Sequence, residues 1–158
     1  MTVKTAVVYY SRHHGNTKKL LDAIAAKHQV TLINASQPMK GDLAQYDLIG
    51  FASGIYYSKF HKSVLQFAEE HLPAGKDVFF VYTCGAEKDG YTKAIQAAVQ
   101  KKGARVVGSF GCLGYDTFGP FKLVGGIAKG HPDDTELAGA LRFYEGLLDA
   151  ANEEQAQG

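Results

Sequence analysis

The amino-acid sequence predicts a single doubly wound α/β domain, in which a five-stranded parallel sheet carries helices on both faces. The chain has 158 residues, of which 46% are hydrophobic and 21% charged, and this suits one compact domain. Short apolar runs rich in β-branched and aromatic residues are typical of strands that are buried on both faces. Segments of helical periodicity alternate with these runs, which predicts parallel strands joined by right-handed crossovers.

The strands are predicted from apolar runs of four to six residues. The first, residues 5–10, reads Thr-Ala-Val-Val-Tyr-Tyr and lacks the alternating polar residues of a strand with one face in solvent. Four later runs have the same character. They cover residues 30–33, 48–52, 78–83 and 106–110.

The helices are predicted from apolar residues that recur on one face. Residues 16–28 have this pattern, with leucine or isoleucine at positions 20, 21 and 24. The pattern over residues 64–72 ends at Pro73, and the pattern over residues 94–99 ends before Gly103. The connection over residues 34–46 has room for one helical turn, at residues 41–45.

The C-terminal third begins with an irregular segment and ends in a helix. Residues 114–132 contain five glycines, and this stretch either covers one edge of the sheet or takes part directly in function. The last helix is predicted over residues 137–148, with the carboxylate of Asp133 or Asp134 at its start. The domain is expected to span residues 1–150, and residues 151–158, which are small and polar, are expected to fray.

Charge and cysteine content exclude several classes of protein. The net charge of +1 is far from the basic excess of a nucleic-acid-binding protein. Cys84 and Cys112 have the spacing of neither a secreted disulfide framework nor a zinc site, so we expect free, buried thiols and a cytoplasmic location. The first apolar run is too short for a signal peptide or a membrane span.

Ligands of an open parallel sheet bind outside the carboxyl ends of its strands. After the first strand the chain reads Ser11-Arg-His-His-Gly-Asn-Thr17, directly before a helix. Hydroxyl groups, a glycine and free amides at a helix N-terminus can cradle a phosphate. The alternative is an ordinary strand-to-helix turn in which Asn16 caps the helix.

This loop resembles the first loop of the flavodoxin family, a Ser/Thr-x-Thr-Gly-x-Thr pattern that wraps the phosphate of flavin mononucleotide (FMN). The matching residues are Ser11, Gly15, Asn16 and Thr17. The loop is one residue longer than the family pattern and has His13 and His14 in place of a single threonine. The two imidazoles either help to neutralise the phosphate or make ordinary solvent and backbone contacts.

Two further segments resemble the family loops that hold the isoalloxazine ring. The first follows the third strand and includes Ser53, Gly54, Ile55, Tyr56 and Tyr57. In it the glycine allows close approach of the backbone, and one tyrosine offers a face for stacking while the other belongs to the core or the rim.

The second ring-binding segment follows the fourth strand. It begins with Cys84 and Gly85 and ends at Tyr91, whose ring is expected to close the site. The three segments together contain six lysine and arginine residues and only two carboxylates. Since electron-carrier flavodoxins are acidic in this region, we expect a weaker reductant and an attraction for an anionic donor.

The resemblance implies the strand order 2-1-3-4-5, noncovalent FMN and electron transfer without a catalytic side chain or a metal. A redox protein, a quinone or NAD(P)H would be the partner, and the chain would act as a monomer or a homodimer. Three alternatives stay open. The chain could be a binding module that has lost FMN, an NAD(P)H- or quinone-linked flavin reductase, or an enzyme acting on a phosphorylated small molecule.

Overall fold

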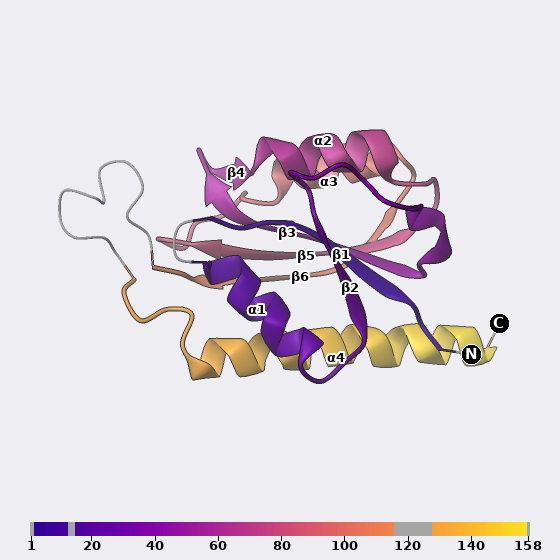
Figure 1. The fold of residues 1–158 in the computed structure, drawn as a ribbon. Coiled ribbons are helices and arrows are strands. Elements are labelled where there is room, and N and C mark those ends of the chain that lie inside the picture. Colours follow the sequence, from indigo (N-terminus) through magenta and orange to yellow (C-terminus); the bar gives the residue numbers. More distant parts are fainter. Residues whose placement is uncertain (1, 13–14, 116–127, 158) are drawn as a thin grey trace.

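A parallel sheet between two layers of helices forms the protein (Figure 1). The structure is a computed structural model and describes residues 2–12, 15–115 and 128–157. The parallel strands occur in the order β2-β1-β3-β5-β6. Their bounds are Thr5–Tyr10 for β1, Val30–Asn34 for β2, Leu48–Tyr56 for β3, Asp77–Cys84 for β5 and Arg105–Leu113 for β6.

A sixth, two-residue strand adds to this sheet. Strand β4, Lys59–Phe60, pairs antiparallel with the end of β3, so β3 extends beyond its predicted end to Tyr56. Without β4, the five parallel strands have the predicted order 2-1-3-4-5. The fold class and the strand order are therefore confirmed, with this short hairpin as the one addition among the described residues.

The register aligns the carboxyl ends of the central strands. Tyr10 at the end of β1 lies opposite Ser53 in β3, and Gly54 lies opposite Thr83 in β5. The end of β5 in turn pairs with β6, where Thr83 lies opposite Cys112. The loops that follow these strands therefore emerge along one edge of the sheet.

Helices cover both faces of the sheet, as predicted (Figure 1). Helix α1, Asn16–Ala25, and helix α4, Asp134–Gln157, pack on one face, while α2, Lys62–His71, and α3, Lys93–Gln100, lie on the other. A single 3-10 turn, η1, forms at Leu43–Gln45, where one turn was predicted.

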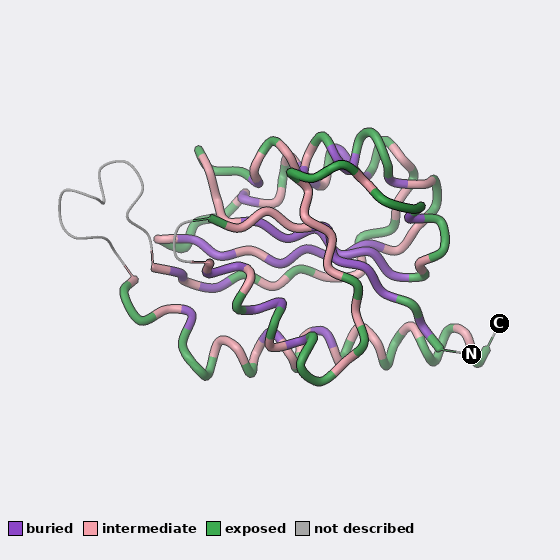
Figure 2. The backbone as a smooth tube through the Cα atoms, viewed as in Figure 1, coloured by how far each residue is buried: buried purple, intermediate pink, exposed green. Residues whose placement is uncertain are grey.

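The core consists of two apolar layers separated by the sheet (Figure 2). Successive residues of β1 alternate between them, since Val8 packs toward α2 while Val7 packs toward α1 and α4. Phe80 and Val81 of β5 divide in the same way. This alternation explains why the central strands read as continuous apolar runs.

Helix α4 continues to Gln157, well past the predicted helix end. Near its C-terminus the Glu154 carboxylate forms an ion pair of 2.8 Å with Arg105 at the start of β6. Arg105 also pairs with Asp77 of β5, so this exposed group ties the helix end to two strands. Fraying of residues 151–158 stays a prediction. None of the helices in the described part of the chain is long and apolar enough to cross a membrane.

Candidate functional site

A cavity lies at the sheet edge where the carboxyl ends of β1, β3, β5 and β6 converge, and we call it the loop-end cavity. It is lined by Arg12, Asn16, Gly54, Ile55, Tyr56, Thr83, Cys84, Gly85, Gly114 and Tyr115. All three segments singled out in the sequence contribute to this lining. Gly114 and Tyr115, from the segment after β6, were not predicted to join them.

The start of α1 supplies the polar wall of this cavity. Gly15 occupies the cap position with φ of 66°, and no side chain caps the helix. Asn16 is only 7% exposed; its Nδ2 donates to the Tyr115 carbonyl oxygen at 2.7 Å, and its Oδ1 has no hydrogen-bond partner among the described residues. The alternative in which Asn16 caps the helix is therefore wrong, because its side chain is directed toward residues after β6 instead.

Gly114 is required by the packing around Asn16. A Cβ atom at position 114 would lie 2.7 Å from Asn16 Nδ2 and 2.9 Å from Asn16 Cβ. Real Cβ atoms essentially never approach other atoms that closely. The backbone at Gly114 thus holds the Asn16 side chain against the cavity.

Thr17 is linked to the end of β5. Its hydroxyl lies 2.8 Å from the hydroxyl of Thr83, and both side chains are almost fully buried. The Ser11 hydroxyl accepts a hydrogen bond of 3.2 Å from the Lys18 amide, which closes the loop over the first turn of α1. The sequence did not identify Thr83 as a site residue. The pattern that could have revealed it is a threonine among the apolar residues of β5.

The hairpin between β3 and β4 has a strained tip. Tyr56 pairs with Lys59, so Tyr57 and Ser58 form a two-residue turn with φ of 52° and 66°. Positive φ at both positions is the geometry of a type I′ turn, which favours asparagine and glycine. The Tyr57 side chain is 84% exposed. A bulky residue in this conformation costs about 1 kcal/mol or more and points to a functional role for the tip.

Tyr56 belongs to the rim, as expected for one tyrosine of the pair. Its ring meets the rings of Tyr10 and His61 edge-on, at centroid distances of 5.9 Å and 5.0 Å. Tyr10 and His61 stack on each other at 3.7 Å with an interplanar angle of 9°. We call these three residues, with Tyr57 and Phe60, the aromatic cluster.

His61 holds the base of the hairpin to α2. Its Nδ1 accepts the Ser63 amide at 3.1 Å as the N-cap of α2, and its own amide donates to the Ser53 hydroxyl at 3.0 Å. Burial lowers the pKa of His61, and Lys62 and Arg12 lower it further, so the ring is neutral near pH 7. Ser53 is fully buried and braces the hairpin. The sequence assigned His61 no role, although its place before a Lys-Ser helix start was a usable signal.

The segment after β5 is braced from below by Tyr91. This side chain is 7% exposed, and its hydroxyl donates to the Ala86 carbonyl oxygen at 2.6 Å. Its ring meets Tyr82 edge-on at 5.8 Å. The Tyr91 ring thus packs beneath the loop, and the expectation that it closes the site stays a prediction.

The two cysteines lie side by side near the cavity as free, buried thiols, as predicted. Cys84 Sγ donates to the Cys112 carbonyl oxygen at 3.5 Å. Burial, with the Glu136 carboxylate adding to it, raises the pKa of the Cys112 thiol to about 12. Since a thiol is a nucleophile only when ionised, Cys112 behaves as a small apolar side chain.

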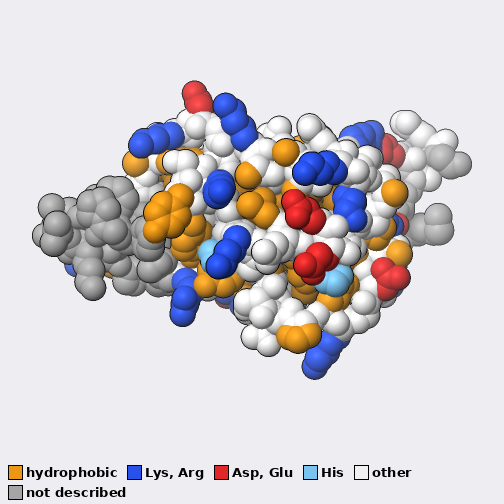
Figure 3. Space-filling model, turned by 90° about the horizontal axis from the view of Figure 1, so that it is seen from above, with side chains coloured by type: hydrophobic (Ala, Val, Ile, Leu, Met, Phe, Trp, Pro, Cys, Tyr) orange, Lys and Arg blue, Asp and Glu red, His pale blue; other side chains and the backbone are white. Residues whose placement is uncertain are grey.

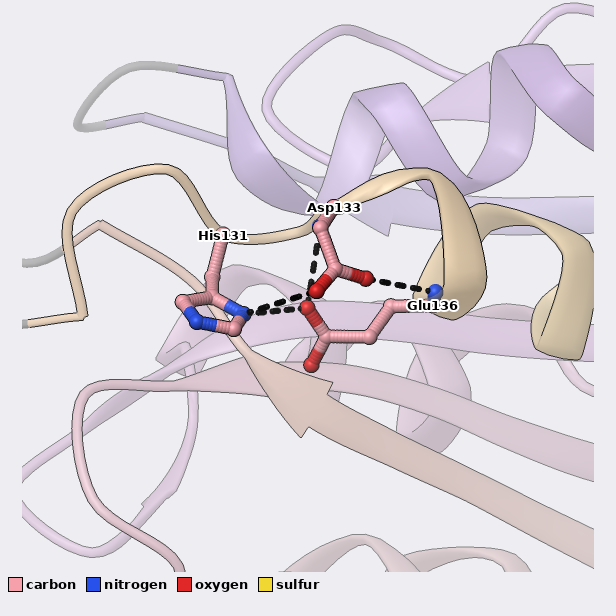
Figure 4. A group of neighbouring side chains, drawn as sticks. All are labelled: His131, Asp133 and Glu136. Atoms are coloured by element: carbon pink, nitrogen blue, oxygen red, sulfur yellow. Dashed lines mark hydrogen bonds and ion pairs between the residues drawn. The ribbon is translucent and has the colours of Figure 1, made fainter.

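A polar cluster joins the start of α4 to the end of β6 (Figure 4). Asp133 caps α4, because its Oδ1 accepts the Glu136 amide at 2.9 Å while Glu136 Oε1 accepts the Asp133 amide at the same distance. His131 Nδ1 donates to Glu136 at 2.5 Å, and this bond raises the pKa of His131. The three side chains could surround a cation, but the hydrogen bonds among them make a capping box.

His13 and His14, for which both phosphate neutralisation and ordinary contacts were expected as alternatives, lie outside the described residues, as does most of the segment over residues 114–132.

Comparisons with known proteins cover most of the chain. A model of the flavodoxin domain matches residues 7–122. An uncharacterized protein of Methanocaldococcus jannaschii is 35% identical over 148 residues, which are 92% of this chain and 99% of that protein.

Solved structures share the fold. A flavodoxin from the domain Archaea superposes with a TM-score of 0.73 at 21% identity, covering 95% of this chain and 99% of that chain. General stress protein 14 of Treponema denticola, solved in complex with FMN, gives a TM-score of 0.61 at 16% identity and covers 94% of this chain and 99% of that chain.

Proposed function

The chain belongs to the flavodoxin family, and from this membership we propose that it binds FMN without a covalent link at the loop-end cavity and transfers electrons. When bound, FMN supplies one- and two-electron redox chemistry, while the protein binds it and sets its potential. One observation carries the proposal. The nearly buried Asn16 side chain lies at the N-terminus of α1, in the cavity wall, and its oxygen, which has no partner among the described residues, can accept a hydrogen bond from a hydroxyl of the FMN side chain.

The start of α1 fits a phosphate. The backbone amides of its first turn carry the positive end of the helix dipole, and Gly15 leaves space because no other part of the described chain comes within 4 Å of a Cβ placed there. Ser11, Asn16 and Thr17 add hydroxyl and amide groups beside those N–H groups. We propose that these residues hold the phosphate, with His13 and His14 beside them.

Two loops fit a flat ring. The hairpin offers the exposed Tyr57 at its tip, and the Gly54 and Gly85 backbones line the cavity beside the Tyr56 ring. We propose that the ring lies between the hairpin and the segment after β5. Tyr91 supports that segment from below and does not stack on the ring.

The charge around the cavity bears on the reduction potential. Arg12 lines the cavity and is exposed, the exposed Lys59 and Lys62 lie on the neighbouring hairpin and the start of α2, and Glu87 and Asp89 lie on the segment after β5. A cationic rim stabilises anionic reduced FMN and raises its potential, although solvent and salt weaken the effect of exposed charges. We propose that this chain is a weaker reductant than a flavodoxin with an acidic rim.

An absorption spectrum tests FMN binding. The protein is purified, mixed with FMN, freed of excess ligand and scanned in the visible and near ultraviolet. Retained flavin bands with a melting temperature raised by FMN are expected, since a ligand that binds only the folded state stabilises it. A colourless protein with an unchanged melting temperature would refute the proposal and favour a binding module that uses this fold without flavin.

A further inference from the structure

A groove runs beside the hairpin and the start of α2, separate from the wall formed by Asn16. It has a volume of about 470 Å3 and is lined by the aromatic cluster together with Arg12, Lys59 and Lys62. Figure 3 shows hydrophobic side chains open to solvent on this side of the molecule, with Lys and Arg side chains among them. The volume is in the range of sites for small molecules, which are about 300 to 1,000 Å3.

The walls of the groove suit a planar ring. The stacked rings of Tyr10 and His61 form one rigid surface, and the edge of Tyr56 meets both. Phe60, fully buried, also lines the groove and packs against Phe80 and Tyr82 of β5. Stacking on such aromatic rings adds to the free energy of burial.

The rim of the groove suits an anion. Arg12, Lys59 and Lys62 are exposed, and none of them forms an ion pair with a carboxylate of the described residues. None of the residues lining the groove is acidic. A concave, partly apolar surface with charges of one sign concentrates ligands of the opposite sign.

The groove adjoins the loop-end cavity. Arg12 and Tyr56 line both, so a ligand in the groove and a ligand in the cavity would contact the same two side chains. A molecule bound in the groove is thus placed beside the proposed flavin.

We infer that this groove binds the nicotinamide dinucleotide that reduces the flavin, an inference that rests on the proposed FMN site. The dinucleotide combines planar rings, which suit the aromatic cluster, with phosphates, which suit the three cations. Reduced dinucleotide would give up a hydride to the bound flavin and become oxidised itself, and without a further proton this transfer yields the anionic reduced flavin. A neutral quinone would use the aromatic walls but not the cations.

Calorimetric titration tests this site. The oxidised dinucleotides NADP+ and NAD+ are titrated into flavin-free and FMN-loaded protein, because they bind without reacting. Binding to both forms is expected, with affinity that falls as salt shortens the Debye length from about 30 Å at 0.01 M to about 3 Å at 1 M. The double variant Lys59→Gln/Lys62→Gln should lose roughly tenfold or more in affinity.

Two controls make the titration specific. Lys27→Gln removes the same kind of charge from an exposed site after α1, at the opposite end of that helix, and should leave affinity unchanged. Pyrophosphate alone and menadione, a neutral quinone, are titrated in parallel. The inference requires pyrophosphate and menadione to bind more weakly than NADP+, since pyrophosphate lacks the planar rings and menadione lacks the negative charge.

The outcomes separate this inference from the proposed function. FMN retention without dinucleotide binding would overturn the inference and leave the FMN site standing. Dinucleotide binding that depends on Lys59 and Lys62, in a protein that retains no FMN, would support the groove and refute the FMN proposal. Pyrophosphate that binds as tightly as NADP+, or salt-independent binding of menadione, would overturn the assignment of the groove to a dinucleotide.

Discussion

The hydrogen bond between Thr17 and Thr83 allows a matched test of the phosphate site. Their hydroxyl oxygens lie 2.8 Å apart, and the residues are 1% and 4% exposed. Thr17→Val and Thr83→Val each delete this bond and leave one buried hydroxyl without its partner. Each should therefore lower the free energy of unfolding by about 1 to 3 kcal/mol.

The two variants should differ in FMN affinity. Only Thr17 lies in the first turn of α1, where its hydroxyl can donate to a bound phosphate. A hydrogen bond to a charged group contributes roughly 1.5 to 3 kcal/mol, so Thr17→Val should weaken FMN binding about tenfold to a hundredfold. Thr83 also lines the loop-end cavity but lies at the end of β5, outside that turn, so Thr83→Val should weaken FMN binding less.

Fluorescence titration with FMN and urea denaturation measure the two effects separately. Equal loss of stability shows that both substitutions disturb the fold alike, so a difference in affinity then reports on the ligand. Equal loss of FMN affinity in the two variants, or a larger loss in Thr83→Val, would refute the assignment of Thr17 to the phosphate.

Three other substitutions or conditions probe the site. Gly114→Ala should displace Asn16, because the new Cβ would lie 2.7 Å from Asn16 Nδ2. The variant should therefore have a lower melting temperature and a weaker affinity for FMN. A wild-type melting temperature together with a wild-type affinity would contradict this packing. Tyr57→Asn should relieve the strained turn and stabilise the protein by up to about 1 kcal/mol while weakening FMN binding, which thermal melts and titration would show; an unchanged affinity would remove Tyr57 from the site. The Glu136 bond raises the pKa of His131, so its stabilisation is complete below the unfolded pKa of about 6.5 and declines as pH rises through the folded value. Urea melts across this range should show the decline, and Glu136→Gln should flatten it; a slope retained in the variant would assign it to other groups.

The residues in the loops at the candidate site show which features the sequence could predict and which it could not. Gly15, Asn16 and Thr17 were placed at the correct sheet edge, because parallel strands bring their following loops to the same side. The orientation of Asn16 was not predictable, since it depends on the Tyr115 carbonyl, 99 positions away in the chain. The packing of Tyr91 was not predictable for a similar reason: a sequence pattern shows that an aromatic residue follows a strand, but only packing decides whether its ring faces a ligand or the core.

The sequence by itself determined the class of fold, the order of helices and strands and the sheet edge at which the candidate site lies. These features follow from hydrophobic periodicity and chain connectivity, which are local or topological. The tertiary structure decided the short β3–β4 hairpin, the role of His61 as both helix cap and stacking partner, and the groove that Arg12 and Tyr56 share with the loop-end cavity. The groove and the stacking of His61 on Tyr10 arise from contacts between segments distant in the chain, whose geometry no local pattern encodes. The hairpin is local, but Tyr57 and Ser58 are not the asparagine and glycine that such a turn favours.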